Sequence, residues 1–232
     1  MLTQKPPDLR STLIKKDLNW KIDFAHKIIR KALKNDPAYF VAFTGGKDST
    51  VLLHLVKTVV GIQSRVNILH INTTVKFPEI MNFIDKMVKL YNLNLYRYTN
   101  TEALSRGLKI AKNVTECCGE LKINALKQAI EKFKIEVLFV GIRWDEQVAR
   151  YEERIYIRKD NHLRVHPITP FTEKDIWDYI KMFNIPYCSL YAQGYRSIGC
   201  MPCTRIDKSA ERAGRDNTKE DLMRNLRKIG YF

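Results

Sequence analysis

The stretch of sequence that decides the fold is F-T-G-G-K-D-S-T-V-L-L, residues 43–53. It ends the run 39–43, whose aromatic and β-branched side chains predict a buried strand. Residues 50–56 follow with the apolar pattern of a helix. The segment Thr44-Gly45-Gly46-Lys47-Asp48-Ser49 is therefore predicted to be a turn that leads from a strand into a helix.

This turn has the composition of a phosphate-binding site. Gly45 and Gly46 allow the backbone to turn tightly and to approach a ligand closely. Amides at a helix start point outward, and the helix dipole favours an anion there. Lys47 adds a positive charge and Ser49 adds a hydroxyl donor. The spacing differs from the G-x-x-x-x-G-K-[ST] loop of common nucleotide hydrolases, and the alternative is a simple turn capped by an Asp or a Ser.

The turn resembles the PP-loop of the adenine-nucleotide alpha-hydrolase-like superfamily, whose usual form is S-G-G-x-D-S. Thr44 replaces the first Ser and keeps its hydroxyl. The resemblance implies a site for ATP or a related adenylyl nucleotide, and cleavage of ATP between its α and β phosphates. It implies nucleotide contacts from the whole turn, with Lys47 and Asp48 in catalytic roles. Mg²⁺ is an expected cofactor because it bridges phosphate oxygens.

Strand and helix patterns alternate along the rest of the chain. Strands are predicted at 66–72, 93–98, 137–141 and 164–168, and helices at 13–35, 78–91, 117–133 and 170–183. This order predicts an α/β fold with a parallel twisted sheet and helices on both faces. Ligands of such sheets bind beyond the carboxyl ends of the strands. The predicted turn and Asn72-Thr73-Thr74 both lie at that edge.

The chain is divided into three parts by this pattern. Residues 1–12 are predicted to be a flexible arm, and residues 13–190 the nucleotide-binding domain. Residues 191–232 are predicted to be a cysteine-containing C-terminal segment that packs on the same domain and includes a helix near 219–228.

Two further stretches resemble sulfonucleotide enzymes of this superfamily. N-T-T-V-K-F-P-E, residues 72–79, is similar to the D-T-T-x-K-F-P-E of ATP sulfurylase small subunits, where it borders the nucleotide, although Asn72 replaces the usual Asp. G-I-R-W-D-E-x-x-x-R, residues 141–150, is similar to a family motif that faces phosphates and a sulfonyl group. The resemblance implies nucleotide contacts from Asn72, Thr73, Thr74, Gly141 and Arg143, and a catalytic role for Arg143. The alternative for residues 143–157 is a solvated helix with internal ion pairs.

The cysteines form a separate signal. C-C-G-E-L-K, residues 117–122, and G-C-M-P-C-T, residues 199–204, resemble the C-C-x-x-x-K and G-C-x-P-C-T of assimilatory adenylylsulfate reductases. In those enzymes the two pairs hold a [4Fe–4S] cluster, which implies Cys117, Cys118, Cys200 and Cys203 as metal ligands here. Four thiolates also suit tetrahedral zinc, and unrelated free cysteines are the third interpretation. Cys188 is expected to be a small buried side chain.

The reductases also carry a catalytic cysteine in a tail of the form E-C-G-L-H. Here E-R-A-G-R-D, residues 211–216, resembles the run before that tail, but no cysteine follows Cys203. ATP sulfurylase small subunits, for their part, usually lack the cluster pattern. ATP-pyrophosphatase proteins of DNA phosphorothioation systems resemble the reductases, and some carry cluster-type cysteines. That group fits both features, and no nucleophile is assigned from this sequence.

Composition adds a partner class and a location. The formal net charge is +15, from 40 Lys and Arg against 25 Asp and Glu, which indicates either a well-solvated surface or a polyanionic partner such as DNA. No apolar run approaches the roughly 18 residues of a membrane span, and the first residues lack the apolar segment of a signal peptide. We therefore expect a cytoplasmic protein without membrane contact.

The sequence thus predicts an ATP pyrophosphatase, an adenylylating enzyme of sulfur metabolism, that acts in DNA phosphorothioation and carries a [4Fe–4S] cluster. Its expected partners are an adenine nucleotide, DNA and other sulfur-transfer subunits. Three alternatives stay open. They are an adenylylsulfate or phosphoadenylylsulfate reductase that uses an external thiol, an ATP sulfurylase small subunit, and a non-catalytic subunit that binds nucleotide or DNA.

Overall fold

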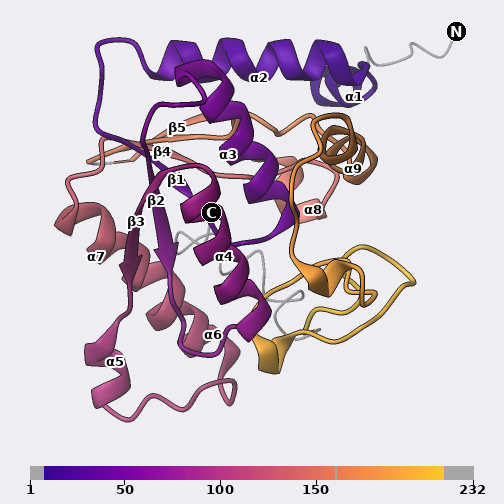
Figure 1. Ribbon diagram of the computed structural model, residues 1–232. Helices are drawn as coiled ribbons and strands as arrows, with labels where there is room; N and C mark the ends of the chain where they lie inside the picture. Colours follow the sequence, from indigo (N-terminus) through magenta and orange to yellow (C-terminus); the bar gives the residue numbers. More distant parts are fainter. Residues whose placement is uncertain (1–7, 160, 217–232) are drawn as a thin grey trace, which may run out of the picture.

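The computed structural model describes residues 8–159 and 161–216, and within them a single twisted sheet lies between two layers of helices (Figure 1). The strands follow the order β3-β2-β1-β4-β6-β5. Their bounds are β1 Tyr39–Ala42, β2 Val66–Ile71, β3 Leu93–Tyr98, β4 Val137–Phe139, β5 Tyr156–Arg158 and β6 Leu163–Val165.

The helices alternate with these strands along the chain. The α-helices are α1 Leu9–Ile14, α2 Leu18–Ala32, α3 Lys47–Val60, α4 Pro78–Leu90, α5 Thr101–Ser105, α6 Val114–Cys118, α7 Ala125–Lys132, α8 Val148–Tyr151 and α9 Glu173–Met182. A π-helix, η1 Gly119–Asn124, joins α6 to α7, and two short 3₁₀ helices follow α9, η2 Ser189–Tyr191 and η3 Met201–Cys203. The predicted α/β class is confirmed.

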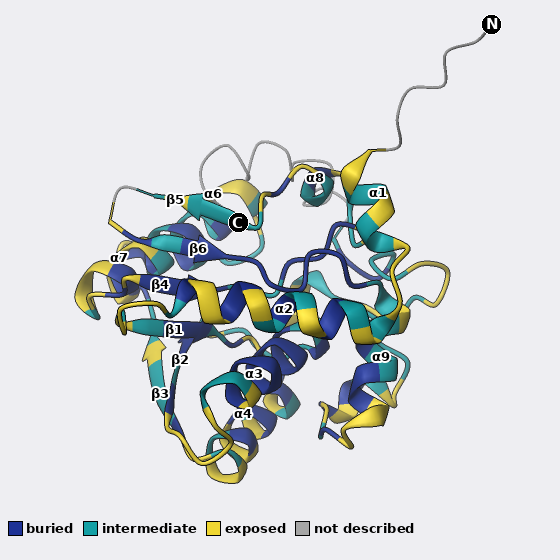
Figure 2. Cartoon of the chain, turned by 90° about the horizontal axis from the view of Figure 1, so that it is seen from above, coloured by how far each residue is buried: buried dark blue, intermediate teal, exposed yellow. Residues whose placement is uncertain are grey.

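The sheet buries its two faces against different helices. Neighbouring strand residues point to opposite faces, so Val41 packs with α2, α3, α4 and α9 while Phe40 packs with α7. The same alternation holds in β4, where Leu138 faces α7 and Phe139 faces the opposite side. Viewed from above, α3, α4 and α9 lie on one side of the sheet and α6 on the other (Figure 2).

The strand order places a crevice at one point of the sheet edge. From β1 the chain proceeds outward through β2 and β3, and it then returns to place β4 on the other side of β1. The loops after β1 and β4 therefore diverge, and such a switch point is where parallel sheets bind ligands. The turn 43–49 follows β1 and Gly141 follows β4, so both predicted motifs reach this crevice.

Three elements differ from the sequence-based expectation. The sheet is not wholly parallel, because β5 runs antiparallel to β6. Strand β5 begins at the end of the charged stretch 143–157, and its three residues are too few to show the alternation of a strand in the sequence. Helix α1, which the Asp8 side chain caps, includes residues 9–12 of the stretch that was predicted to be an arm. The long first helix is interrupted because Asp17 caps a new one, accepting from Trp20 N at 2.9 Å.

The C-terminal segment, up to residue 216, lies against the same core. Tyr191, Tyr195 and Ile198 pack on the cluster formed by the sheet and helices α2, α3, α4 and α9. Met201 N donates to Val75 O at 2.8 Å, which joins the segment to the loop after β2. The helix predicted near 219–228 lies outside the described residues. Among the described helices, none has the length and apolar character needed to cross a membrane.

Candidate active site

The turn between β1 and α3 is held by its own hydroxyl groups. Gly46 N donates to Thr44 Oγ1 at 3.3 Å, and the hydroxyls of Thr44 and Ser49 lie 3.1 Å apart. Gly45 has a φ of +78°, which glycine adopts without strain, and a Cβ there would lie 3.1 Å from Ile80 Cγ2. Helix α3 then begins at Lys47, so its first amides point into the crevice.

Lys47 is buried and surrounded by hydrogen-bond acceptors. Its Nζ lies 2.6 Å from Glu211 Oε1, 3.1 Å from Arg196 O and 3.4 Å from Asp48 Oδ2. Its backbone amide donates to the Tyr191 hydroxyl at 2.8 Å. Burial disfavours the charged amine, but Asp48, Tyr191 and Glu211 hold the pKa of Lys47 well above its ordinary value. Lys47 is therefore a permanent cation at the start of α3.

Arg143 connects the acids of this site. Its guanidinium is fully buried and contacts the carboxylates of Asp48, Asp145 and Glu211, with Asp145 Oδ1 at 2.6 Å. Burial raises the pKa of Asp48, but Arg143 and Lys47 outweigh it and keep that pKa below its ordinary value. At Asp145 burial prevails over Arg143 and raises the pKa to about 6. Arg143 thus holds three chain segments together through their carboxylates.

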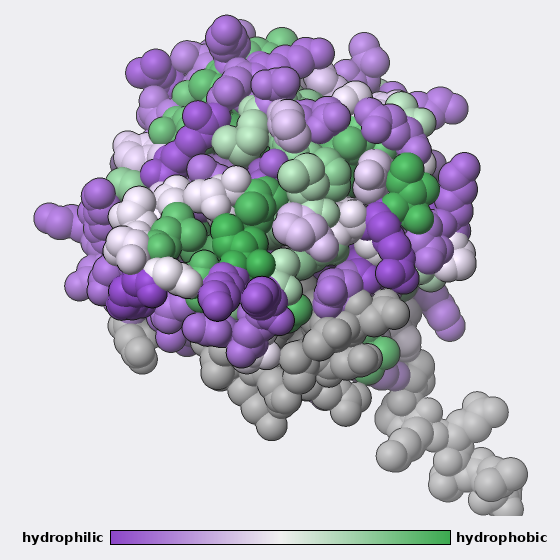
Figure 3. All heavy atoms as spheres, turned by 90° about the horizontal axis from the view of Figure 1, so that it is seen from below, coloured by the Kyte–Doolittle hydropathy of each residue, from purple (hydrophilic) through white to green (hydrophobic). Residues whose placement is uncertain are grey.

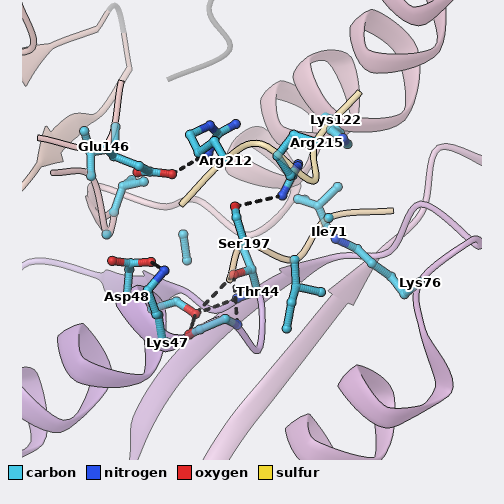
Figure 4. Close-up of a pocket in the computed structure, with 18 of the residues that line it drawn as sticks. Thr44, Lys47, Asp48, Ile71, Lys76, Lys122, Glu146, Ser197, Arg212 and Arg215 are labelled. Carbon is cyan, nitrogen blue, oxygen red and sulfur yellow. Dashed lines mark hydrogen bonds and ion pairs between the residues drawn. The ribbon is translucent and has the colours of Figure 1, made fainter. Parts of the chain in front are cut away.

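A cavity of about 260 Å³ opens in front of the turn. Apolar side chains line part of it, and they come from β1, β2, the loop after β4, α7 and the C-terminal segment: Ala42, Leu69, Ile71, Leu126, Val140, Ile142 and Ile198. Basic side chains also line it, namely Arg150 and the labelled Lys47, Lys76, Lys122, Arg212 and Arg215 of Figure 4. Seen from below, apolar atoms gather in the centre of this face with hydrophilic ones at its border (Figure 3). This arrangement suits a molecule with a flat apolar part and several negative charges.

Glu146 orients two of the cavity's arginines. It is largely buried and forms ion pairs with Arg150 and Arg212, the latter at 2.5 Å. Burial raises the pKa of Glu146, but Arg150 and Arg212 lower it below the ordinary value. Arg212 comes from the C-terminal segment, so Glu146 also fastens that segment to the loop after β4 (Figure 4).

Most of the predicted nucleotide-binding residues line the cavity, namely Thr44, Gly46, Lys47, Asp48, Ser49, Thr73 and Gly141. At Gly141 the loop after β4 lies close to the start of α3, because a Cβ there would lie only 3.2 Å from the backbone carbonyl carbon of Asp48. Four other predicted residues are not among the lining residues: Gly45, Asn72, Thr74 and Arg143. Asn72 instead accepts from Thr74 N at 3.0 Å, and so stabilises the turn after β2.

Several residues at the site were not predicted individually. They all lie inside stretches that resemble family motifs, but no local pattern assigned contacts to them: Lys76, Lys122, Glu146, Glu211, Arg212 and Arg215. Tyr191 had no sequence signal. Its hydroxyl meets Lys47 across 144 positions of the chain, and burial raises its pKa to about 12.

The four cysteines of the two pairs lie at the same edge of the sheet. Cys200 Sγ is 3.2 Å from Thr73 Oγ1, and Cys118 Sγ is 3.7 Å from Lys122 Nζ. Burial raises the pKa of the Cys117 thiol, and electrostatic repulsion from the thiolates of Cys118 and Cys200 raises it further. The donor types fit a thiolate-bound metal or cluster. Across residues 8–159 and 161–216, however, no three Cys, His, Asp or Glu side chains are grouped closely enough to hold a metal ion.

Comparison with known protein families gives one match over most of the chain. The model of the phosphoadenosine phosphosulfate reductase domain matches residues 38–206. Sulfate adenylyltransferase subunit 2 of Methylobacterium sp. strain 4-46 is 32% identical over 198 residues, which cover 74% of this chain and 64% of that protein. The same subunit of Trichlorobacter lovleyi is 30% identical, with 74% of this chain and 66% of that protein covered. The chain thus spans somewhat less than two thirds of these relatives.

Solved structures share the fold. A phosphoadenylyl-sulfate reductase from Candida auris, in a phosphate complex, has a TM-score of 0.64 and 18% identity, and covers 85% of this chain and 94% of its own. FMN adenylyltransferase of Candida glabrata with ATP has a TM-score of 0.63 and 21% identity, covering 87% and 73%. The U34-tRNA thiolase NcsA of Methanococcus maripaludis, with its [4Fe–4S] cluster, has a TM-score of 0.57 and 17% identity, covering 99% and 84%.

Proposed function

The chain belongs to the phosphoadenosine phosphosulfate reductase domain family, and from this membership we propose that it is an adenylylating enzyme of sulfur metabolism. In the proposed reaction an acceptor attacks the α phosphate of ATP, which releases pyrophosphate and leaves AMP on the acceptor. The observation that carries the proposal is the double-glycine turn, whose helix start and buried Lys47 open into an apolar cavity with a basic border.

We assign a task to each part of this cavity. The apolar wall formed by Ile71, Leu126 and their neighbours takes the adenine ring, and the turn takes the leaving phosphates. Lys47 neutralises the charge that develops on pyrophosphate, which is the main contribution to catalysis in such transfers. Mg²⁺ would enter with the nucleotide and would supply part of the charge that neutralises its phosphates. Arg143 does not line the cavity, so we assign it the positioning of Asp48 rather than contact with substrate.

The curated relatives and the family model support different forms of this proposal. The sulfate adenylyltransferase subunits support nucleotidyl transfer, and here the chain would act as the small subunit of an ATP sulfurylase. The family name supports the reduction of a sulfonucleotide by an external thiol. A third form keeps nucleotide binding without turnover. We favour ATP cleavage, because the basic side chains of the cavity can neutralise a triphosphate.

Product analysis separates these forms. The protein is incubated in parallel with ATP, adenylylsulfate and phosphoadenylylsulfate, each with Mg²⁺, thioredoxin and a reductant. We expect pyrophosphate from ATP and no sulfite from the other two. Thioredoxin-dependent sulfite at a steady rate would establish the reductase form instead. Nucleotide binding without either product would leave a binding subunit.

We further propose that the acceptor system is DNA phosphorothioation, with DNA and other sulfur-transfer subunits as partners. The net charge of +15 supports a phosphate-backbone partner. Association with DNA should then weaken steeply with added salt, because bound counterions are released from the backbone. Binding of duplex DNA measured by fluorescence anisotropy between low and physiological salt tests this, and absence of binding at low salt would remove DNA from the proposal.

We also propose that Cys117, Cys118, Cys200 and Cys203 hold a [4Fe–4S] cluster when iron and sulfide are supplied. Anaerobically prepared protein is expected to contain about four iron and four sulfide per chain, as thiolate ligation of a cubane requires. Cys200→Ser should lose the iron, while Cys188→Ser should keep it, because Cys188 is buried beside Leu190 in the core. Stoichiometric zinc without iron in such a preparation would contradict the assignment.

A further inference from the structure

Glu211 occupies an unusual place for an acid in a site that is built for anions. Its carboxylate forms ion pairs with Lys47, at 2.6 Å, and with Arg143, and its side chain is only 12% exposed. Lys47 is a buried cation at the start of α3, and Arg143, also buried, lies in the loop after β4. A carboxylate therefore neutralises Lys47, the cation that a ligand phosphate would meet in the cavity.

The loop that carries Glu211 is closed at its base. Thr204 and Arg215 form an antiparallel bridge, and Arg205 N donates to Gly214 O at 2.8 Å. A Cβ on Gly214 would lie 2.1 Å from Arg205 O, so this closure requires glycine. The base fixes where the loop leaves the C-terminal segment, and Glu211 lies between its two ends.

A second group from the same segment covers the helix start. The Tyr191 hydroxyl accepts the amide hydrogen of Lys47 at 2.8 Å, and its ring lies 5.8 Å from Lys47 Nζ. The first amide of α3 and the ammonium group of Lys47 are thus both bonded to residues of the C-terminal segment. A phosphate at this position must compete with groups that belong to the chain itself.

We propose that Glu211 is a specificity-determining residue, an internal anion that holds the phosphate position of the turn until a polyphosphate displaces it. This inference deepens the proposed function, since it concerns the same turn. A ligand phosphate must replace the contact that this carboxylate makes with Lys47 Nζ, while Arg143 keeps its pairs with Asp48 and Asp145. Pyrophosphate, or the β and γ phosphates of ATP, offers several charged oxygens for this exchange. AMP has none of these phosphates and does not reach the position.

Binding of inorganic pyrophosphate to Glu211→Gln tests the proposal by calorimetry. The variant keeps the size of the side chain and removes its charge. We expect it to bind pyrophosphate roughly tenfold more tightly than wild type, the scale of one charge-assisted hydrogen bond. Glu173→Gln is the matched control, because Glu173 is also largely buried and ion-paired, but with Arg196 and not with Lys47. Its affinity for pyrophosphate should equal that of wild type.

A second variant keeps the proposal testable if Glu211→Gln fails to fold. Glu211→Asp keeps the charge but is too short to reach both cations, so it should also bind pyrophosphate more tightly, by a smaller factor. Unchanged or weaker pyrophosphate binding in both variants would overturn the proposal. An equal gain in AMP affinity would do the same, because a general charge effect acts on both ligands. Pyrophosphate binding needs no turnover, so this result is independent of whether wild type cleaves ATP.

Discussion

Lys47→Ala is expected to lower the rate of pyrophosphate release from ATP by roughly 100- to 1000-fold, the usual loss for one preorganised charge-stabilising donor. The physical reason is the position of Nζ, a buried ammonium at the start of α3 that surrounding acids keep charged. The variant should also bind pyrophosphate more weakly than wild type. Steady-state pyrophosphate release at saturating ATP and calorimetric binding measure the two effects.

Lys57→Met is the matched control for this experiment. Lys57 is a buried lysine of the same helix, and it donates to Tyr91 O at 2.9 Å, away from the cavity. Its loss should lower the free energy of unfolding and leave the rate close to that of wild type. If Lys47→Ala retained wild-type turnover and binding, the turn would not be the phosphate site.

Arg143→Met is expected to destabilise the protein by about 3–5 kcal/mol, the usual cost of leaving buried charges without their partner. The arginine is fully buried, and its removal leaves Asp145 without its ion pair and leaves Lys47 as the one remaining partner of both Asp48 and Glu211 among the ion pairs of the described residues. Urea unfolding at pH 7 followed by circular dichroism measures the change in the free energy of unfolding.

Arg97→Met provides the comparison for an exposed arginine. Arg97 pairs with Asp85, and both side chains are well exposed, at 39% and 54%, so its loss should cost no more than about 1 kcal/mol. A loss of the same small size for Arg143→Met would show that the acids around it are solvated, and its assignment as a positioning residue would fail.

The local part of the fold was predictable because its signals are short-range. Two glycines between a β-branched run and an apolar helix pattern predicted the turn, and α3 begins within it at Lys47. The helix predicted at 170–183 contains α9, whose start is held by a capping box between Thr172 and Asp175. Strand β5 was missed because it depends on its pairing with β6 and not on a pattern of its own.

Only some of the residues that meet at the site could be predicted, because sequence patterns report contacts between residues that are near one another in the chain. The β1–α3 turn could be identified from its own backbone requirements, and Gly141 from its place in a stretch that resembles a family motif. Glu211 meets Lys47 across 164 positions of the chain, and no local pattern reports such a contact. Arg143 was expected to contact a ligand. In the structure its guanidinium forms ion pairs with neighbouring acids, Asp48 among them, and Arg143 is not among the residues that line the cavity. Charge alone did not reveal which basic residues face the cavity.

In the proposed reaction the turn directs attack to the α phosphate of ATP, and the products of labelled ATP show which phosphorus atom is attacked. ATP labelled separately at its α and γ phosphorus atoms is incubated with the protein, Mg²⁺ and the cognate acceptor system. The γ label is predicted to leave in pyrophosphate, and the α label to remain with AMP or with an adenylylated acceptor, at a rate that Lys47→Ala removes. Appearance of the γ label in orthophosphate, with ADP carrying the α label, would show cleavage between the β and γ phosphates and would contradict attack at the α phosphate.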